Sequence, residues 1–470
     1  MEYTVTQSSV VAGDPHICSD SNARNNILYS VYEALVTRNA SGGFSPCLAR
    51  SWGVEQDGLT WRLHLREGVR FHNGTQLKGS DVVASLRRVV DPSIGGAYGT
   101  QGVYAGYIGG ASLEAPRQDE VMIRTGEPLA DLLDLLSEMP IAPEDELHRL
   151  PREYVGTGPY MVGKDGRDEL TLEVFRGYWG GAPEAGSITW LAEPDPVQRA
   201  QMVVDRDADI GCMIGVEGKH RAVAEGTVVA EQDSGLCIIF MLNCFKGSCV
   251  DSRFRQALNH ALDVPAIIRL VKRGEARQLS GFVTPHHYGY DPETAPYKYE
   301  RDWARSLLSE AGYGGGHQLV MDVPMSMPDE APQLASIMGE MYGAIGLEVE
   351  VRHYRDRPAY AEMVREKRIG DMCCFDSSPR STFRVLREKL HSGFKGPWWE
   401  GYSNLEVDRL AWEAQRTFDD EARRRVYQRV FRVVRDDAPW VFLYRPNYHW
   451  AVGQMTRGWK PEPDGLVRLG

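Results

Sequence analysis

Two hydrophobic periodicities, one typical of strands and one typical of helices, alternate along the chain. Residues 60–65 alternate apolar and polar side chains, which predicts a strand. Apolar residues at 254, 257, 258, 261 and 262 repeat at helical spacing and predict a helix capped by Asp251 or Ser252. Ser80 is predicted to cap another helix, and Pro265 stands at a permitted early helical position. The pattern therefore predicts a mixture of both elements.

The order of these elements predicts an α/β fold. Helical spacing over residues 334–345 ends at Gly346 and leads into an alternating strand at 347–351. A long amphipathic helix near 420–435 likewise precedes a strand at 441–444. Such units build sheets with helices on their faces. Because no repeat, low-complexity run or long linker is present, the domain junctions are predicted to be short crossings, as in a hinged, two-lobed protein.

Composition narrows the functional classes. The 470 residues are 42% hydrophobic and 25% charged, which is typical of a soluble globular protein of several domains. A net charge of -12 disfavours nucleic acid as a partner, because a phosphate-binding surface needs a basic excess. No apolar run reaches the length of a membrane span. Eight scattered cysteines lack zinc-site spacing, and whether Cys244 and Cys249 close a disulfide loop is left open.

Motifs of catalysis are absent from the chain. It has no phosphate-binding loop, no dinucleotide-binding glycine motif, no nucleophile elbow and no His-Glu-x-x-His helix. The pair His286 and His287 stands in a loop between prolines and glycines, where exposed histidines are a simpler interpretation than metal ligands. We therefore expect neither an enzyme, nor a cofactor, nor a metal site.

Aromatic residues in one turn-rich segment are candidates for a binding wall. Trp398, Trp399 and Tyr402 lie among glycines and a proline. Large aromatic side chains often line ligand pockets. They also pack a loop against its own domain, and the sequence alone leaves both interpretations open.

A series of short motifs resembles the extracellular solute-binding proteins of the dipeptide, oligopeptide and nickel class, which serve ABC importers. Each motif is weak by itself, but they follow the family's order from the first strand to the C-terminus. The matching segments are residues 14–16, 29–36, 46–52, 57–61, 69–75, 81–83, 156–160, 177–180, 251–258, 311–313, 401–404 and 438–441.

The resemblance implies a two-lobed, hinged periplasmic-binding-protein fold (class II type, cluster C) with an extra subdomain inserted in the first lobe. We expect lobe I over residues 1–36, 151–236 and 441–470, the inserted subdomain over 37–150, and lobe II over 237–440. It further implies a monomer that binds a small solute by hinge closure and contacts ABC transporter permease subunits. The expected location is periplasmic, or extracellular with a lipid anchor, with the leader absent from this sequence.

The residues at the family's ligand anchors depart from the dipeptide-binding pattern. Such members hold the peptide ammonium with an aspartate after a strand of lobe II, and its carboxylate with an arginine. By alignment Ser378 takes the aspartate position, Asp376 stands two residues earlier, and residues 325–330 contain no arginine. An ordinary dipeptide is therefore not the expected ligand.

Arg380, among neighbouring hydroxyl groups, is the candidate that replaces these anchors. With Ser377 and Ser378 it could clamp a carboxylate or phosphate; alternatively it caps local backbone or faces solvent. His16 and Ser9 are further candidates, since the segment after the first strand often faces the cleft in such proteins.

The sequence thus predicts the substrate-binding component of an ABC importer for a modified peptide, an opine-like conjugate or a sugar acid. The alternative is a cytosolic or regulatory ligand sensor of the same fold. The sequence does not fix the ligand, its affinity or the compartment.

Overall fold

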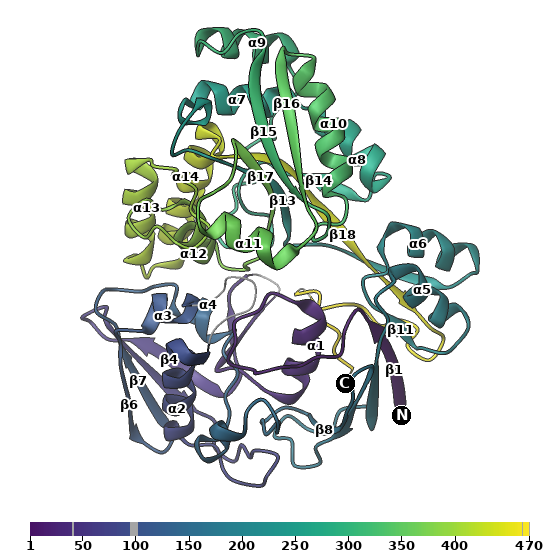
Figure 1. The fold of residues 1–470 in the computed structure, drawn as a ribbon. Helices are drawn as coiled ribbons and strands as arrows, with labels where there is room; N and C mark the ends of the chain where they lie inside the picture. The colour runs from purple at the N-terminus through teal and green to yellow at the C-terminus, as the bar shows by residue number, and fades with distance from the viewer. Residues whose placement is uncertain (40–41, 95–101, 463, 470) are drawn as a thin grey trace. The chain divides into compact units, whose positions relative to one another are not determined.

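The computed structural model describes residues 1–39, 42–94, 102–462 and 464–469 and divides the chain into two compact units (Figure 1). Unit 1 comprises Met1–Gln232 and Tyr448–Gly470, and unit 2 comprises Asp233–Asn447. The chain therefore crosses between the units at 232/233 and 447/448, where the sequence analysis set the boundaries at 236/237 and 440/441.

Unit 1 contains a mixed sheet in the order β11-β1-β10-β9-β8. Strand β1 (Glu2–Gln7) runs parallel to both β10 and β11, and its alternate residues enter a core that includes Val5, Trp190 and Trp450. Helix α1 (Asn22–Val31) begins at Ser21, whose side chain accepts a hydrogen bond from the backbone of Arg24. The other elements of this sheet and its helices are β8 (Tyr160–Asp165), β9 (Glu169–Val174), β10 (Ser187–Ala192), α5 (Pro196–Val204), β11 (Ile210–Gly211), α6 (Gly215–Ala224) and β12 (Val228–Asp233).

A second, antiparallel sheet in the order β4-β5-β7-β6 lies within the predicted inserted segment. Strand β5 (Thr60–Leu65) has the predicted bounds. Helix α2 (Gly79–Val89) begins before Ser80, so the predicted cap is wrong: the cap is Lys78, whose backbone N–H donates to Asp81 Oδ2 at 2.8 Å. The earlier start depends on Gly79, where a Cβ would lie 2.8 Å from the carbonyl oxygen of Glu120.

The remaining elements of this part of unit 1 are short. They are β2 (Val36–Arg38), β3 (Phe44–Pro46), β4 (Ala49–Val54), the 3-10 turn Pro92–Ile94, α3 (Val103–Ile108), β6 (Ser112–Arg117), β7 (Glu120–Arg124), α4 (Leu132–Leu136) and the 3-10 turn Glu144–Arg149.

Unit 2 has a sheet in the order β16-β15-β17-β13-β18. Helices α7 to α10 contribute to the main core, which also takes alternate strand residues such as Phe240, Met321 and Cys374. Strand β18 (Trp440–Val452) begins in unit 2, where it pairs with β13 and β14, and ends in unit 1, where it pairs with β11.

The helices and strands of unit 2 include the predicted ones at 254–262, 334–345, 347–351 and 420–435, and others that the sequence analysis did not predict. They are β13 (Cys237–Leu242), the 3-10 turn Ser248–Val250, α7 (Ser252–His260), α8 (Val264–Lys272), β14 (Ala276–Gln278), α9 (Arg301–Glu310), β15 (His317–Pro324), α10 (Ala331–Gly343), β16 (Leu347–Tyr354), α11 (Arg357–Arg365), β17 (Met372–Ser377), α12 (Thr382–Val385), the π-turn Leu386–Leu390, α13 (Leu405–Gln415) and α14 (Asp420–Asp437).

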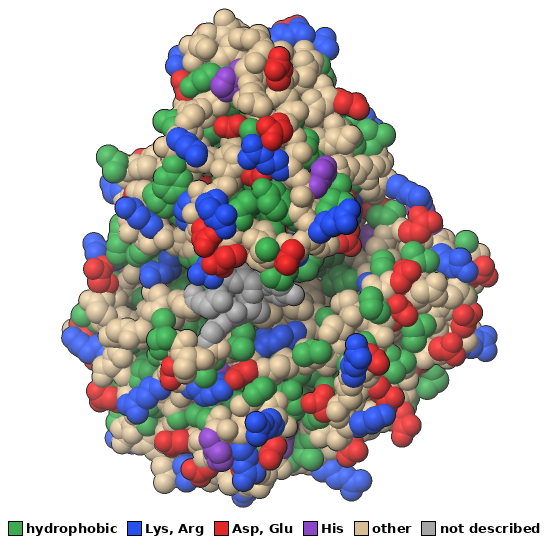
Figure 2. Space-filling view, viewed as in Figure 1, with side chains coloured by type: hydrophobic (Ala, Val, Ile, Leu, Met, Phe, Trp, Pro, Cys, Tyr) green, Lys and Arg blue, Asp and Glu red, His purple; other side chains and the backbone are tan. Residues whose placement is uncertain are grey.

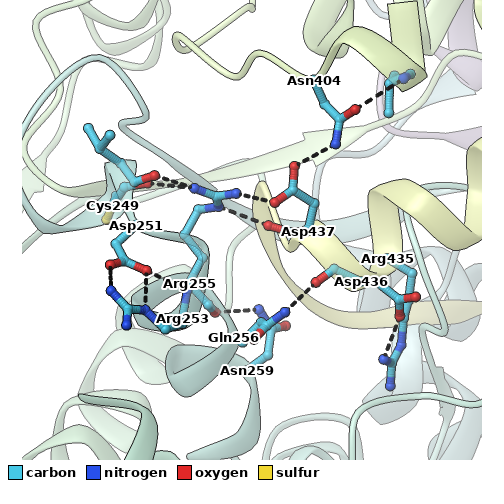
Figure 3. A network of polar contacts seen from close by, with 12 residues as sticks. Cys249, Asp251, Arg253, Arg255, Gln256, Asn259, Asn404, Arg435, Asp436 and Asp437 are labelled. Carbon is cyan, nitrogen blue, oxygen red and sulfur yellow. Dashed lines mark hydrogen bonds and ion pairs between the residues drawn. The ribbon is translucent and has the colours of Figure 1, made fainter. Parts of the chain in front are cut away.

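Arg255 joins two distant segments of unit 2 through its guanidinium group (Figure 3). Its Nη1 donates to the carbonyl oxygens of Cys249 and Val250, at 3.1 and 2.9 Å. Its Nε and Nη2 donate to the backbone and the carboxylate of Asp437, at 2.9 and 2.6 Å. The start of α7 is thereby fixed to the end of α14, so this family motif has a structural role.

The surface carries charges of both signs. On the face in view, Lys and Arg side chains are interspersed with Asp and Glu (Figure 2). Within the part of the chain that the structure describes, none of the helices combines the length and apolar character needed to cross a bilayer.

Candidate functional site

Strand β17 and the turn after it carry four of the predicted ligand-binding residues. Ser377 is buried, whereas Asp376, Ser378 and Arg380 are half-buried. The strand is fixed by antiparallel pairing with β13, in which Ser377 lies opposite Cys237. The end of a central strand thus presents polar side chains on a rigid element.

The loop at residues 284–288 holds this turn in place. His287 Nε2 donates to the carbonyl oxygen of Pro379 at 2.7 Å, and its Nδ1 accepts from the backbone N–H of Thr284 at 3.2 Å. Thr382 Oγ1 donates to the carbonyl oxygen of Tyr288 at 2.5 Å. His287 is buried, so the interpretation of this histidine as an exposed loop residue is wrong.

Phe375 brings the aromatic segment to the end of β17. Its ring centre lies 4.7 Å from that of Trp398. The guanidinium carbon of Arg357 lies 5.4 Å from the same ring, and Lys389 Nζ lies 5.7 Å from it. Such distances are typical of cation–π contacts. One apolar wall and two cations therefore meet beside Asp376.

Positive charge exceeds negative charge at this place. Lys389 Nζ, on a side chain that is 3% exposed, donates to Ser377 Oγ at 2.9 Å. Arg357 Nη2 lies 4.0 Å from Asp376 Oδ1. Two cations, Arg357 and Lys389, therefore lie beside Asp376. The nearby Arg384 and Glu388 form their own pair at 2.6 Å and add no net charge.

Sequence reasoning missed Arg357, Lys389 and Phe375. Arg357 is the first residue of α11, and Lys389 stands in a π-turn twelve residues after Ser377. No spacing rule connects a helix start, a π-turn and a strand. Lys389 stands in a stretch that also contains Arg384, Arg387 and Glu388, so its burial has no signal in the sequence.

Trp399 and Tyr402 contact residues other than those at the end of β17. Trp399 Nε1 donates to the carbonyl oxygen of Tyr402 at 2.5 Å, and its ring packs against Phe245 at 5.0 Å. Tyr402 is buried, with the Arg255 guanidinium carbon 6.0 Å from its ring. These contacts favour loop packing, and ligand binding by the two residues stays a prediction.

His16 and Ser9 lie in unit 1 and have local partners. His16 is buried; its Nε2 donates to the carbonyl oxygen of Pro140 at 3.0 Å, and its Nδ1 accepts from Arg88 Nη1 at 3.1 Å. Burial and the charge of Arg88 lower the pKa of His16 to about 4. Ser9 Oγ accepts from the backbone N–H of Val11 at 3.3 Å. Their role in ligand binding stays a prediction.

Comparison with known proteins relates almost the whole chain to one class of bacterial binding proteins. The model of the family described as "Bacterial extracellular solute-binding proteins, family 5 Middle" matches residues 43–380. The glutathione-binding protein GsiB of Escherichia coli O1:K1 is 26% identical over 471 residues, covering 96% of this chain and 90% of the relative.

Solved structures of similar proteins share the fold. DppA from Helicobacter pylori, in complex with the peptide STSA, has a TM-score of 0.81 at 22% identity and covers 99% of this chain and 96% of its own. AgaA from A. tumefacien R10, in complex with agropinic acid, has a TM-score of 0.80 at 20% identity and covers 99% of this chain and 96% of its own. The predicted two-lobed α/β fold is confirmed.

Proposed function

From the premise that this chain belongs to the bacterial extracellular solute-binding proteins of family 5, we propose that it captures an anionic small solute for an ABC importer. Membership confirms the resemblance that the sequence motifs indicated. Proteins of this family are the periplasmic or extracellular solute-binding components of ABC transporters, work with the transporter's permeases, and are not enzymes.

The excess of positive charge at the end of β17 supports an anionic ligand. Arg357 lies 4.0 Å from the carboxylate of Asp376, and Lys389 donates to the backbone carbonyl oxygen of the same residue, so two cations lie beside one acidic residue. Arginine matches carboxylate and phosphate geometry, and the hydroxyl groups of Ser377 and Ser378 supply further hydrogen bonds. We assign Arg380 the role of clamping a carboxylate, with Trp398 as part of the apolar wall.

The proposed ligands are a modified peptide, an opine-like conjugate or a sugar acid, rather than an ordinary dipeptide. Two similar proteins bind compounds of the first two kinds, namely glutathione and agropinic acid. We propose that the two lobes close on the solute by hinge motion. The presence of only two chain crossings, at 232/233 and 447/448, supports such a motion.

Native mass spectrometry of the freshly purified protein tests this function, followed by a thermal-shift screen of modified peptides, opines and sugar acids. We expect a carboxylate-bearing solute to bind and Arg380→Ala to weaken it about tenfold or more, the value of a charge-assisted hydrogen bond. Arg368→Ala is the matched control, because this arginine is 64% exposed and paired with Glu366. Unchanged affinity in Arg380→Ala would show that the clamp is misassigned.

A further inference from the structure

A groove lies between helix α2 and the edge of the four-stranded sheet of unit 1. Strand β6 is the last strand in the order β4-β5-β7-β6, and among the described strands it pairs with β7 alone (Figure 1). The groove has a volume of about 400 Å³. One wall is a stripe of α2 that includes Ser80, Ala84 and Arg87, at the spacing of residues that share one helix face. The other wall is formed by residues 113–116 of β6.

The backbone of Leu113 faces this groove. Arg87 of α2 donates from Nη2 to the carbonyl oxygen of Leu113 at 3.2 Å, so this carbonyl points away from β7. In antiparallel strands the N–H and C=O of one residue point to the same side, which places Leu113 N–H on the groove side as well. The register agrees, because Leu113 lies opposite Ile123, and two residues further along Thr125 donates its N–H toward β5. The edge of β6 therefore has backbone groups that an added strand could use.

The usable part of this edge is short. Pro116 has no N–H to donate, and a register shift lies between Glu114 and Arg117. Prolines and bulges commonly protect sheet edges from pairing with other chains. Here they end the regular edge after residue 115 and leave residues 112–115 open, enough for about four residues of an added strand.

Small side chains leave room in the groove for another backbone. Ser80 and Ala84 contribute them from α2 and Ala115 from β6, while Val83 and Leu113 are buried apolar residues of the lining. Six of the nine lining residues are exposed. A small solute usually loses most of its surface to its site, which so open a groove does not provide. An extended chain, which needs one strand edge and one flanking wall, fits it better.

Two glutamates at the groove have no cationic partner. Glu114 and Glu144 are exposed, and neither forms an ion pair with a described residue. By contrast Glu120, in the same sheet, pairs with both Arg62 and Arg117. A lysine or arginine on an incoming segment would complement this charge.

We propose that this groove docks the permease of the importer: an extended segment on the outer side of the membrane, bearing a lysine or arginine, adds to the edge of β6 and lies against α2. Main-chain hydrogen bonds to β6 supply affinity, and the stripe of α2 with the two glutamates supplies specificity. The proposal goes beyond the proposed function and rests on it only for the identity of the partner. It gives the predicted inserted segment, 37–150, a role separate from solute binding.

The test uses the full chain as purified, with the permease and ATPase subunits of its importer reconstituted in lipid nanodiscs. ATP hydrolysis is measured against the concentration of the binding protein, and the half-saturating concentration reports docking. Ala84→Trp fills the groove, and the double variant Glu114→Lys, Glu144→Lys reverses its charge. We expect each to raise the half-saturating concentration about tenfold or more.

Matched variants elsewhere in unit 1 serve as controls. Ala224→Trp places the same side chain at an exposed position of α6, and Glu67→Lys reverses another exposed glutamate. Both should leave the half-saturating concentration unchanged. Thermal unfolding, with native mass spectrometry of any retained solute, identifies a variant that is merely unstable or no longer loaded.

A photoreactive side chain locates the contact directly. p-Benzoylphenylalanine in place of Ala115 should cross-link to a permease subunit, at an extended segment that contains lysine or arginine. The same residue in place of Ala224 should give no such product.

The outcomes distinguish this inference from the proposed function. If the unaltered protein does not stimulate the importer, the proposed function fails. If it does, and both groove variants act like their controls, the docking assignment is wrong while solute delivery stands. Cross-links between two copies of the chain would show that a second copy occupies the groove, which would also overturn the proposal.

Discussion

The carboxylate of Glu33 offers the sharpest test of how the family motifs stabilise unit 1. It accepts hydrogen bonds from Thr157 Oγ1 and Trp179 Nε1, both at 2.8 Å, and from Tyr178 OH at 2.9 Å. Glu33 itself is 8% exposed. Three motifs that are far apart in the sequence thus meet at one side chain. The perturbation is Glu33→Ala.

The expected loss follows from the three donors that the substitution leaves without an acceptor. A buried donor without a partner costs about 1–3 kcal/mol. Burial raises the pKa of Glu33 above its usual value despite these donors, so removing the carboxylate also removes a desolvation cost. Because Thr157 is buried whereas Tyr178 and Trp179 are half-buried, we expect a net loss of about 2–4 kcal/mol for Glu33→Ala.

Urea unfolding, followed by tryptophan fluorescence, measures this loss. Glu33→Gln keeps one acceptor oxygen and should lose about half as much. Glu173→Ala, at an exposed position of β9, is the control and should change the free energy of unfolding by less than about 0.5 kcal/mol. A loss below about 1 kcal/mol in Glu33→Ala would refute the view that this carboxylate organises the motifs.

Three further predictions concern stability. Arg255→Ala should lower the free energy of unfolding, measured with a chemical denaturant, by about 3 kcal/mol or more, because Asp437 and two carbonyl oxygens lose their donors. A change near zero would contradict this prediction. Burial raises the pKa of Glu400 to about 7, with Lys367 opposing the shift. The folded state therefore holds this proton more tightly than the unfolded state, and stability falls by about 3 kcal/mol as pH rises from about 4.5 to 7. Glu400→Gln should abolish this dependence, which pH-resolved thermal melts would reveal. Burial lowers the pKa of His72 to about 4, so stability should fall by about 3 kcal/mol as pH drops from about 6.5 to 4, and His72→Gln should lessen that fall.

The motifs that made the family recognisable from sequence have structural roles. Glu33, Tyr178 and Trp179 form one hydrogen-bonded cluster, and Arg255 fixes the start of α7. These residues make close contacts within one unit, and their spacing in the sequence is characteristic of the family. The fold class and most helices and strands could therefore be predicted, whereas the cap of α2 could not, because it depends on the close approach of Gly79 to a strand.

The residues proposed to bind the ligand could be predicted only in part. The sequence placed Asp376, Ser377 and Trp398 among the candidates, and the structure packs Trp398 against Phe375, which directly precedes Asp376 and Ser377 in β17. Arg357 joins them from a helix start, and only the folded chain shows that its Nη1 is buried without a partner among the described residues. Loops from several elements supply this chemistry, so its members have no fixed spacing that a single sequence could reveal.

The burial of the cysteines has a practical consequence. All eight lie in the part of the chain that the structure describes; none of these forms a disulfide there, seven are buried and Cys244 is half-buried. Burial raises the pKa of the Cys212, Cys237 and Cys244 thiols to about 12. Because thiol reagents attack the thiolate, the native cysteines should react slowly. A cysteine engineered onto each lobe would then take up fluorophores selectively, and the labelled protein could serve as an optical sensor of its own solute.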